Sequence, residues 1–150
     1  MDRSFVEKNR RELERLRNLV DRLDDSRLQA LVNEHWTVAA VLGHVAFWDG
    51  RALRFAERLA GGEELSHDDA ETGSVDWIND AMRPLLHAIP PRRLAEIALR
   101  TAEDTDERVA SLGPEMMPKL WPADPDSPLN PSRADHRGEH LDDIERALGL

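Results

Sequence analysis

The 150-residue chain contains no cysteine, so disulfide bonds, thiolate metal ligands and a cysteine nucleophile are all excluded. It also contains no tyrosine, only three phenylalanines and four tryptophans. A core with so few aromatic side chains must consist mainly of leucine, valine, isoleucine and alanine, which is typical of helix bundles. The absence of disulfides suits a reducing compartment.

Long apolar runs are missing as well, since no stretch approaches the roughly 20 residues that span a bilayer. The first residues have no apolar segment of the kind found in secretion signals. We therefore expect a cytoplasmic protein. Thirty acidic and 20 basic residues give a formal net charge of -10. Because nucleic acids and anionic membranes are bound chiefly through lysine and arginine, we expect no nucleic acid and no membrane partner.

A chain of this length favours one domain over residues 1–150. Apolar residues recur at helical spacing in four segments, at about residues 4–23, 37–60, 74–112 and 132–148. Strict alternation of apolar and polar residues, the signal of a β-strand, is not found. The pattern therefore predicts an all-α fold, a four-helix bundle.

Several residues mark the ends of these segments. Ser4 and Thr37 are predicted helix N-caps, and Gly61 with Gly62 predicts the end of the second helix. The pair Pro90 and Pro91 should kink or break the third segment.

Residues 113–131 contain six of the nine prolines and predict a long proline-rich connection before the last helix. This connection is either a packed crossover of the bundle or a wall of a pocket with Trp121 pointing inward. We favour the crossover.

The histidines form the strongest candidate site. His136 and His140 are four residues apart, so they lie one turn apart on the same face of the last helix, beside Ile144. His44 should also point inward, because it lies on the flank of the apolar stripe of the second helix. One inward histidine is usually a core residue with its own hydrogen bonds, but three of them could all be satisfied by one shared cation. The pattern predicts a divalent metal ion held by these three residues.

Imidazole nitrogen suits Zn, Ni and Fe equally, so the ligand type does not identify the metal. Three protein ligands leave a coordination position open, which is typical of catalytic sites. Residues 136–140 also match the H-x-x-E-H motif of inverted zincins. Those enzymes need a further ligand downstream, and only ten residues follow His140. We therefore interpret Glu139 as a solvent-facing acid, assign His35, His67 and His87 to the surface, and interpret Trp36 and Trp48 as packing residues.

Two motifs resemble a known family. Residues 36–49, WTVAAVLGHVAFWD, look like the signature "W-T/S, four or five residues, L-x-H-L-x-x-W-D/E". Residues 135–145, DHRGEHLDDIE, resemble "H-x-x-x-H-L-x-x-I". Together they resemble the DinB-like superfamily, which includes the N-terminal domain of mycothiol-dependent maleylpyruvate isomerase and the bacillithiol transferases. The resemblance implies a four-helix bundle, a metal site at His44, His136 and His140, and a homodimer.

The same resemblance implies that the metal activates either a low-molecular-weight thiol or water. Our leading hypothesis is S-transfer from such a thiol to an electrophilic small molecule, in a pocket lined by the second helix and residues 113–131. Only two of the 20 basic residues are lysines, which suggests a GC-rich genome, and an actinobacterial source would make mycothiol the thiol. A metal-dependent hydrolase using bound water, and a non-catalytic helical binding module, are the alternatives.

Overall fold

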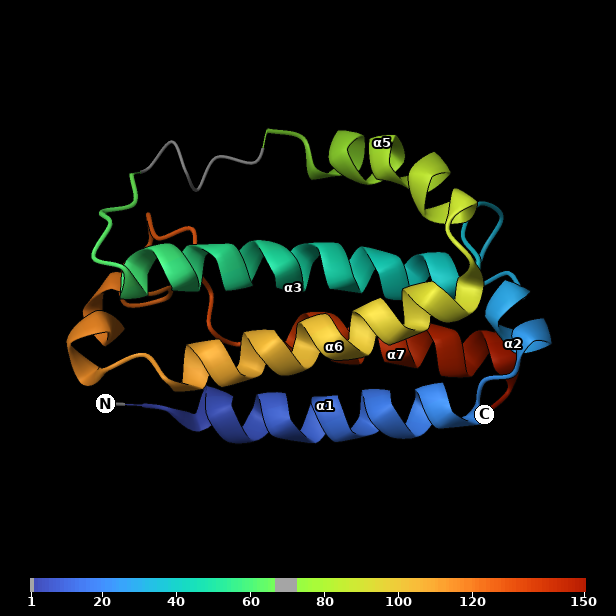
Figure 1. Cartoon of the computed structure of the whole chain (residues 1–150), viewed down its shortest axis with the longest axis horizontal. Helices are drawn as coiled ribbons and strands as arrows, with labels where there is room; N and C mark the ends of the chain where they lie inside the picture. Colours follow the sequence, from blue (N-terminus) through green and yellow to red (C-terminus); the bar gives the residue numbers. More distant parts are fainter. Residues whose placement is uncertain (1, 67–72) are drawn as a thin grey trace.

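Residues 2–66 and 73–150 are described by a computed structural model, and these residues form an all-helical fold (Figure 1). The predicted fold class is therefore confirmed, whereas His67 lies outside the described residues. The helices are α1 (Ser4–Arg22), α2 (Asp25–Gln29), α3 (Val38–Ala60), α5 (Val75–Ala88), α6 (Pro91–Ala110), the short 3-10 helix η1 (Pro114–Lys119) and α7 (Ala134–Leu148).

The four longest helices pack around a common core. Both α3 and α1 contact α6 and α7, so the four close into a ring. In Figure 1, α1 and α7 run in one direction and α3 and α6 in the other. The buried cluster between them is mostly aliphatic, as the scarcity of aromatic residues predicted, and includes Leu16, Leu42, Ala98 and Leu141. Among the described helices, none has the length and apolar character needed to cross a bilayer.

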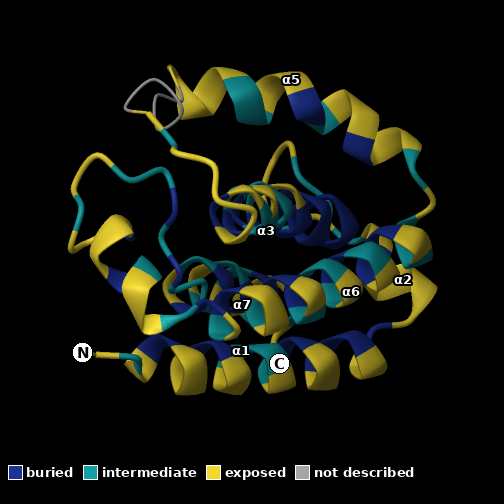
Figure 2. Cartoon of the chain, turned by 60° about the vertical axis from the view of Figure 1, so that its left-hand side comes forward, coloured by how far each residue is buried: buried dark blue, intermediate teal, exposed yellow. Residues whose placement is uncertain are grey.

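The third predicted segment forms two helices, which is one of the two outcomes expected of its proline pair. Helix α5 ends at Ala88, and α6 begins at Pro91, where the missing N–H of proline has no cost. Only α6 enters the ring, while α5 lies outside it against α3 (Figure 2). For this reason α5 buries only Met82 and Leu86.

Close packing beside the candidate site depends on Gly43. A Cβ atom on this residue would lie 2.8 Å from Cδ2 of Leu86 and 2.9 Å from Cδ2 of Leu94. Any larger residue would force the ends of these two leucine side chains, on α5 and α6, to move. The glycine therefore lets both helices approach α3 next to His44.

The connection between α6 and α7 packs as a crossover. Met117, Leu120 and Leu129 are buried in a second apolar cluster together with Phe5 at the start of α1. Trp121 is 46% exposed. The side chains of this connection therefore cover one end of the bundle.

Two predicted helix starts have different outcomes. Thr37 caps α3, since its side-chain oxygen accepts a hydrogen bond of 3.1 Å from the N–H of Ala40. The prediction for Ser4 is wrong, because Ser4 is already the first helical residue and its N–H donates to Oδ1 of Asp2 at 2.7 Å. An aspartate two residues earlier offers a stronger acceptor than the serine hydroxyl.

Helix α7 is capped from another helix. Oδ1 of Asn9, a buried residue of α1, accepts from the N–H of Arg133 at 2.8 Å and from that of Ala134 at 3.1 Å. Its Nδ2 donates to the carbonyl of Pro131 at 2.9 Å. This one side chain fixes where α7 begins, and with it the positions of the two histidines that α7 carries.

Candidate metal centre

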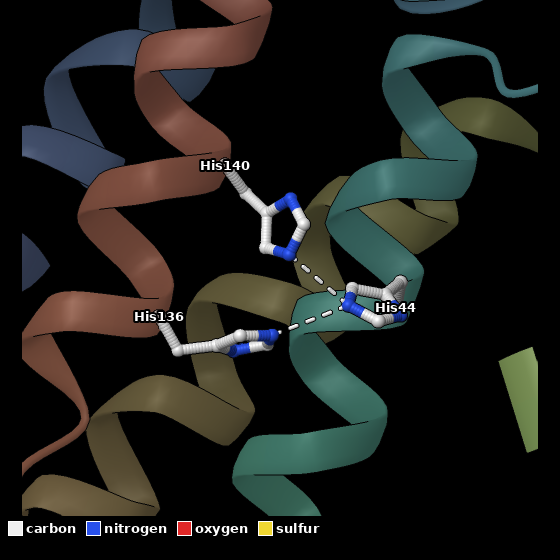
Figure 3. Close-up of side chains that lie close together, drawn as sticks. All are labelled: His44, His136 and His140. Carbon is white, nitrogen blue, oxygen red and sulfur yellow. Dashed lines mark hydrogen bonds between the residues drawn. The ribbon is translucent and has the colours of Figure 1, made fainter. Parts of the chain in front are cut away.

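The three predicted histidines meet between α3 and α7 (Figure 3). Nε2 of His44 lies 3.2 Å from Nε2 of His136 and 3.1 Å from Nε2 of His140. One ring nitrogen from each residue lies within 4.8 Å of the others, so the group could hold a metal ion. The spacing of four residues on α7 and the contact between α3 and α7 together produce this convergence.

The pKa of each of the three imidazoles is lowered, which favours the neutral form. Burial and, to a smaller extent, the neighbouring His140 lower the pKa of His44 to about 4. Burial and the two neighbouring histidines lower the pKa of His136 to about 3. Burial also lowers the pKa of His140, although Glu139 and Asp143 act in the opposite direction. A neutral imidazole keeps a lone pair on one nitrogen, and that lone pair is what a metal ion needs.

Hydrogen bonding alone cannot satisfy the cluster. A neutral imidazole nitrogen carries either one hydrogen or one lone pair, so Nε2 of His44 can form a hydrogen bond with only one of its two neighbours. The other neighbour's Nε2 would then lie against a nitrogen that is already paired, and would have no partner of its own in a partly buried site. A cation between the three nitrogens removes this conflict.

The observed separations fit such a cation. Zinc–nitrogen bonds of 2.0–2.1 Å place two tetrahedral ligands about 3.3 Å apart, and octahedral ligands at similar bond lengths about 3.0 Å apart. The two measured distances of 3.1 and 3.2 Å lie between these values. They therefore suit a first-row divalent metal and do not choose among zinc, nickel and iron.

The outer nitrogens of the rings have few partners. Nδ1 of His140 lies 3.7 Å from Oδ2 of Asp143. Nδ1 of His44 and Nδ1 of His136 are buried and have no hydrogen-bond partner within the described structure. Since a ligating histidine usually donates its second N–H, Asp143 is the residue placed to orient a ring.

A cleft of about 640 Å³ reaches the histidines. Its walls come from residues 32–36, α3, α5 and α7, and Nε1 of Trp48 donates to Oδ1 of Asn79 across the α3–α5 junction at 3.1 Å. No residue of 113–131 lines it, so the predicted second wall of the pocket is wrong and α5 takes that place. The lining residues are Val32, Asn33, Trp36, Val41, His44, Trp48, Val75, Asp76, Asn79, Asp80, His136, His140 and Asp143.

The remaining sequence candidates lie apart from the cluster of nitrogens. His35 and His87 are exposed, as predicted. Glu139 is exposed and lines a different hollow, beside α1. By contrast, Trp36 and Trp48, interpreted as packing residues, pack against His44 and line the cleft.

The sequence interpretation missed a buried ionic network next to the histidines. Arg137 is 0% exposed; its Nε donates to Asp49 at 2.8 Å, and its two terminal nitrogens donate to Asp106 at 2.7 Å each. Arg133 donates to the other oxygen of Asp49 at 3.0 Å. Burial opposes the charge of Arg137, but hydrogen bonds to Asp106 and the charges of both acids keep its pKa above the usual value. The network ties α7 to α3 and α6 directly beside His136.

A sequence signal for this network existed. Asp49 falls on the apolar line of its helix, between Val45 and Ala52, and Arg137 falls on the line of Leu141 and Ile144. An acid on one apolar face and a base on another indicate a buried pair, because neither charge is tolerated alone in a core.

The fold and the site together define an all-helical protein with a candidate three-histidine metal centre. The family model described as "DinB superfamily" matches residues 9–147. The chain therefore belongs to the DinB superfamily. Comparison with curated proteins and with solved structures gave no match.

Proposed function

We propose that the protein is a metal-dependent transferase that activates a low-molecular-weight thiol and joins it to an electrophilic small molecule. The observation that supports a metal is that Nε2 of His44 contacts Nε2 of both His136 and His140 but can form a hydrogen bond with only one of them. The resemblance to thiol-using members of the superfamily supports a thiol as nucleophile. We propose mycothiol as that thiol, on the basis of the arginine-rich composition.

Each part of the chain has a defined task in this proposal. His44, His136 and His140 hold the ion, which lowers the pKa of the thiol and keeps it as the nucleophilic thiolate. The cleft binds both reactants, with Trp36 and Trp48 as apolar walls. The thiol proton passes to solvent, the sulfur lone pair forms the new carbon–sulfur bond, and the displaced group leaves with the electrons of the bond that breaks.

A conjugation assay tests this function. Purified protein is loaded with zinc, nickel or iron and mixed with mycothiol and monochlorobimane, from which chloride is displaced. We expect a rate above the uncatalysed background that chelation abolishes. A rate that does not depend on the metal would overturn the proposal, and turnover of ester or amide substrates in the absence of thiol would favour the hydrolase.

A matched pair of variants separates the site from the rest of the chain. His136→Ala removes one of the three nitrogens, whereas His35→Ala removes an exposed imidazole that neither belongs to the cluster nor lines the cleft. We expect the first variant to lose the metal-dependent rate and the second to keep it. Equal activity of the two variants would contradict a role for the histidine cluster.

A further inference from the structure

The cleft that reaches the histidines carries charge of one sign. Besides the histidines, its ionisable lining residues are Asp76, Asp80 and Asp143, and no lysine or arginine is among its described lining residues. The chain has 20 basic residues, and four other hollows of the described surface each include at least one of them. The absence of basic groups here is therefore a property of this cleft and not of the composition.

Nearby arginines do not cancel this charge. Arg83 lies 3.5 Å from Asp80, and Arg146 lies 3.1 Å from Asp143, both as i,i+3 pairs on helix surfaces. Neither arginine lines the cleft. Surface pairs of this kind are weak and screened, so both carboxylates still act on a molecule inside the cleft.

Observations that do not involve these acids also point to a ligand in the cleft. At its inner end lies His44, which is only 8% exposed and whose Nδ1 has no hydrogen-bond partner within the described structure. The rings of Trp36 and Trp48 pack edge-on against His44, with centroid distances of 5.8 and 6.5 Å. Both tryptophans also line the cleft, where an aromatic ring attracts a cation.

We infer that the cleft selects thiols whose body carries an ammonium group or no charge, and excludes thiols that carry a carboxylate. This inference rests on the proposed function. The thiolate sulfur takes the open position of the bound ion, so the body of the thiol lies against the rest of the cleft. A carboxylate on that body would face three like charges with no basic lining residue to pair with, whereas an ammonium would be attracted by the same three charges and by the two indole rings. Two of the three acids, Asp76 and Asp80, lie on α5 and are the ones we expect to discriminate between the thiols.

Three thiols of nearly equal size test the inference: cysteamine, 2-mercaptoethanol and 3-mercaptopropionate. Their dissociation constants are measured on the Co²⁺-loaded protein from the change in visible absorption when sulfur binds. We expect cysteamine to bind most tightly and 3-mercaptopropionate most weakly. We then divide the dissociation constant of 3-mercaptopropionate by that of cysteamine. In the double variant Asp76→Asn/Asp80→Asn, this ratio should fall about tenfold at low salt. Comparing variants cancels the different intrinsic acidities of the thiols.

The control variant Asp104→Asn/Glu107→Gln removes two charges from a separate hollow on α6, so it changes the net charge equally. It should leave the ratio unchanged, and about 1 M salt should flatten the preference in the wild-type protein. If all three thiols bind and this ratio of dissociation constants is the same in Asp76→Asn/Asp80→Asn as in the wild type, the inference is overturned while the proposed function stands. If no thiol alters the spectrum, the proposed function fails and the inference with it.

Discussion

His44 is the residue by which α3 takes part in the candidate metal site. It comes from α3, while both of its partners come from α7, 92 and 96 residues later. The two α7 histidines alone would give a metal ion only two protein ligands, both from one helix. The third nitrogen completes the set and joins it to the cleft.

Removing His44 should therefore abolish stoichiometric metal binding. In His44→Ala we expect the affinity for zinc to fall by more than about a hundredfold, which exceeds the effect of losing an outer hydrogen-bond partner. The measurement is a competition titration with a chelating indicator on protein prepared without an affinity tag. His87→Ala, which removes an exposed histidine, should bind one equivalent as the wild type does. Equal affinities for the two variants would disprove the site.

The lowered pKa values of the histidines predict how stability depends on pH. In the metal-free protein the pKa is about 4 for His44 and about 3 for His136, against about 6.5 in an unfolded chain. As the pH falls below about 6.5, the unfolded chain takes up protons that the folded chain does not. The free energy of unfolding should therefore fall from about pH 6.5 to about pH 4, by about 3 kcal/mol for His44 alone.

Urea unfolding at a series of pH values in the presence of a chelator measures this loss. Above about pH 7.5 the histidines should contribute almost no slope, because they are then neutral in both states. His44→Gln removes one titrating group and should show a smaller loss over the same window. The same slope in wild type and variant would mean that His44 is not held neutral by the fold.

At the scale of elements, the position of α7 decides whether its two histidines reach α3. Three sets of polar interactions hold the start of α7. They are the hydrogen bonds from Asn9 on α1, the ion pair of Arg133 with Asp49, and the ion pairs of Arg137 with Asp49 and Asp106. Replacing a whole buried ionic network by well-packed apolar residues often leaves the free energy of unfolding unchanged, so stability by itself does not explain such a network. Here the network aligns α7 with α3 and α6.

Arg137→Met should destabilise the protein by about 3 to 5 kcal/mol, because it leaves Asp106 partly buried without its bidentate partner and Asp49 with one partner fewer. Urea unfolding of the metal-free protein at pH 7 measures the change. Arg146→Met is the matched control, since the Arg146 side chain is 75% exposed and pairs only at the surface. The control should change stability by about 0.5 kcal/mol or less, and a similar loss in both variants would disprove the role of the buried network.

At the scale of the whole molecule, a metal at this site would tie α3 to α7 and so stabilise the entire ring of helices. A ligand that binds only the folded state at about one hundred times its dissociation constant adds about 2.7 kcal/mol. For a chain of this size, that gain raises Tm by about 5 to 10 °C.

Differential scanning calorimetry with and without zinc, at fixed protein concentration, checks this expectation. A chelator should reverse the shift in the wild-type protein. His136→Ala lacks one of the three nitrogens and should show no shift at the same metal concentration. A shift of equal size in the variant would place the bound metal elsewhere on the chain.

The features that depend on neighbours along the chain can be predicted from the sequence. Helical periodicity predicted the segments, Thr37 and Gly61 marked the ends of α3, and the spacing of His136 and His140 placed two imidazoles on one face. Each of these follows from hydrogen bonds and side-chain directions within a few residues. Local rules are therefore sufficient for them.

Which distant residues meet follows from how the helices pack and could not be predicted from local patterns. It placed α5 outside the ring and made it a wall of the cleft, a place we had assigned to residues 113–131. It also brought Asp49 within 2.8 Å of Arg137, 88 residues away. Whether a charged side chain is buried depends on a partner supplied by another helix. Helical periodicity indicates that Asp49 and Arg137 face the core, but it does not show that these two side chains meet.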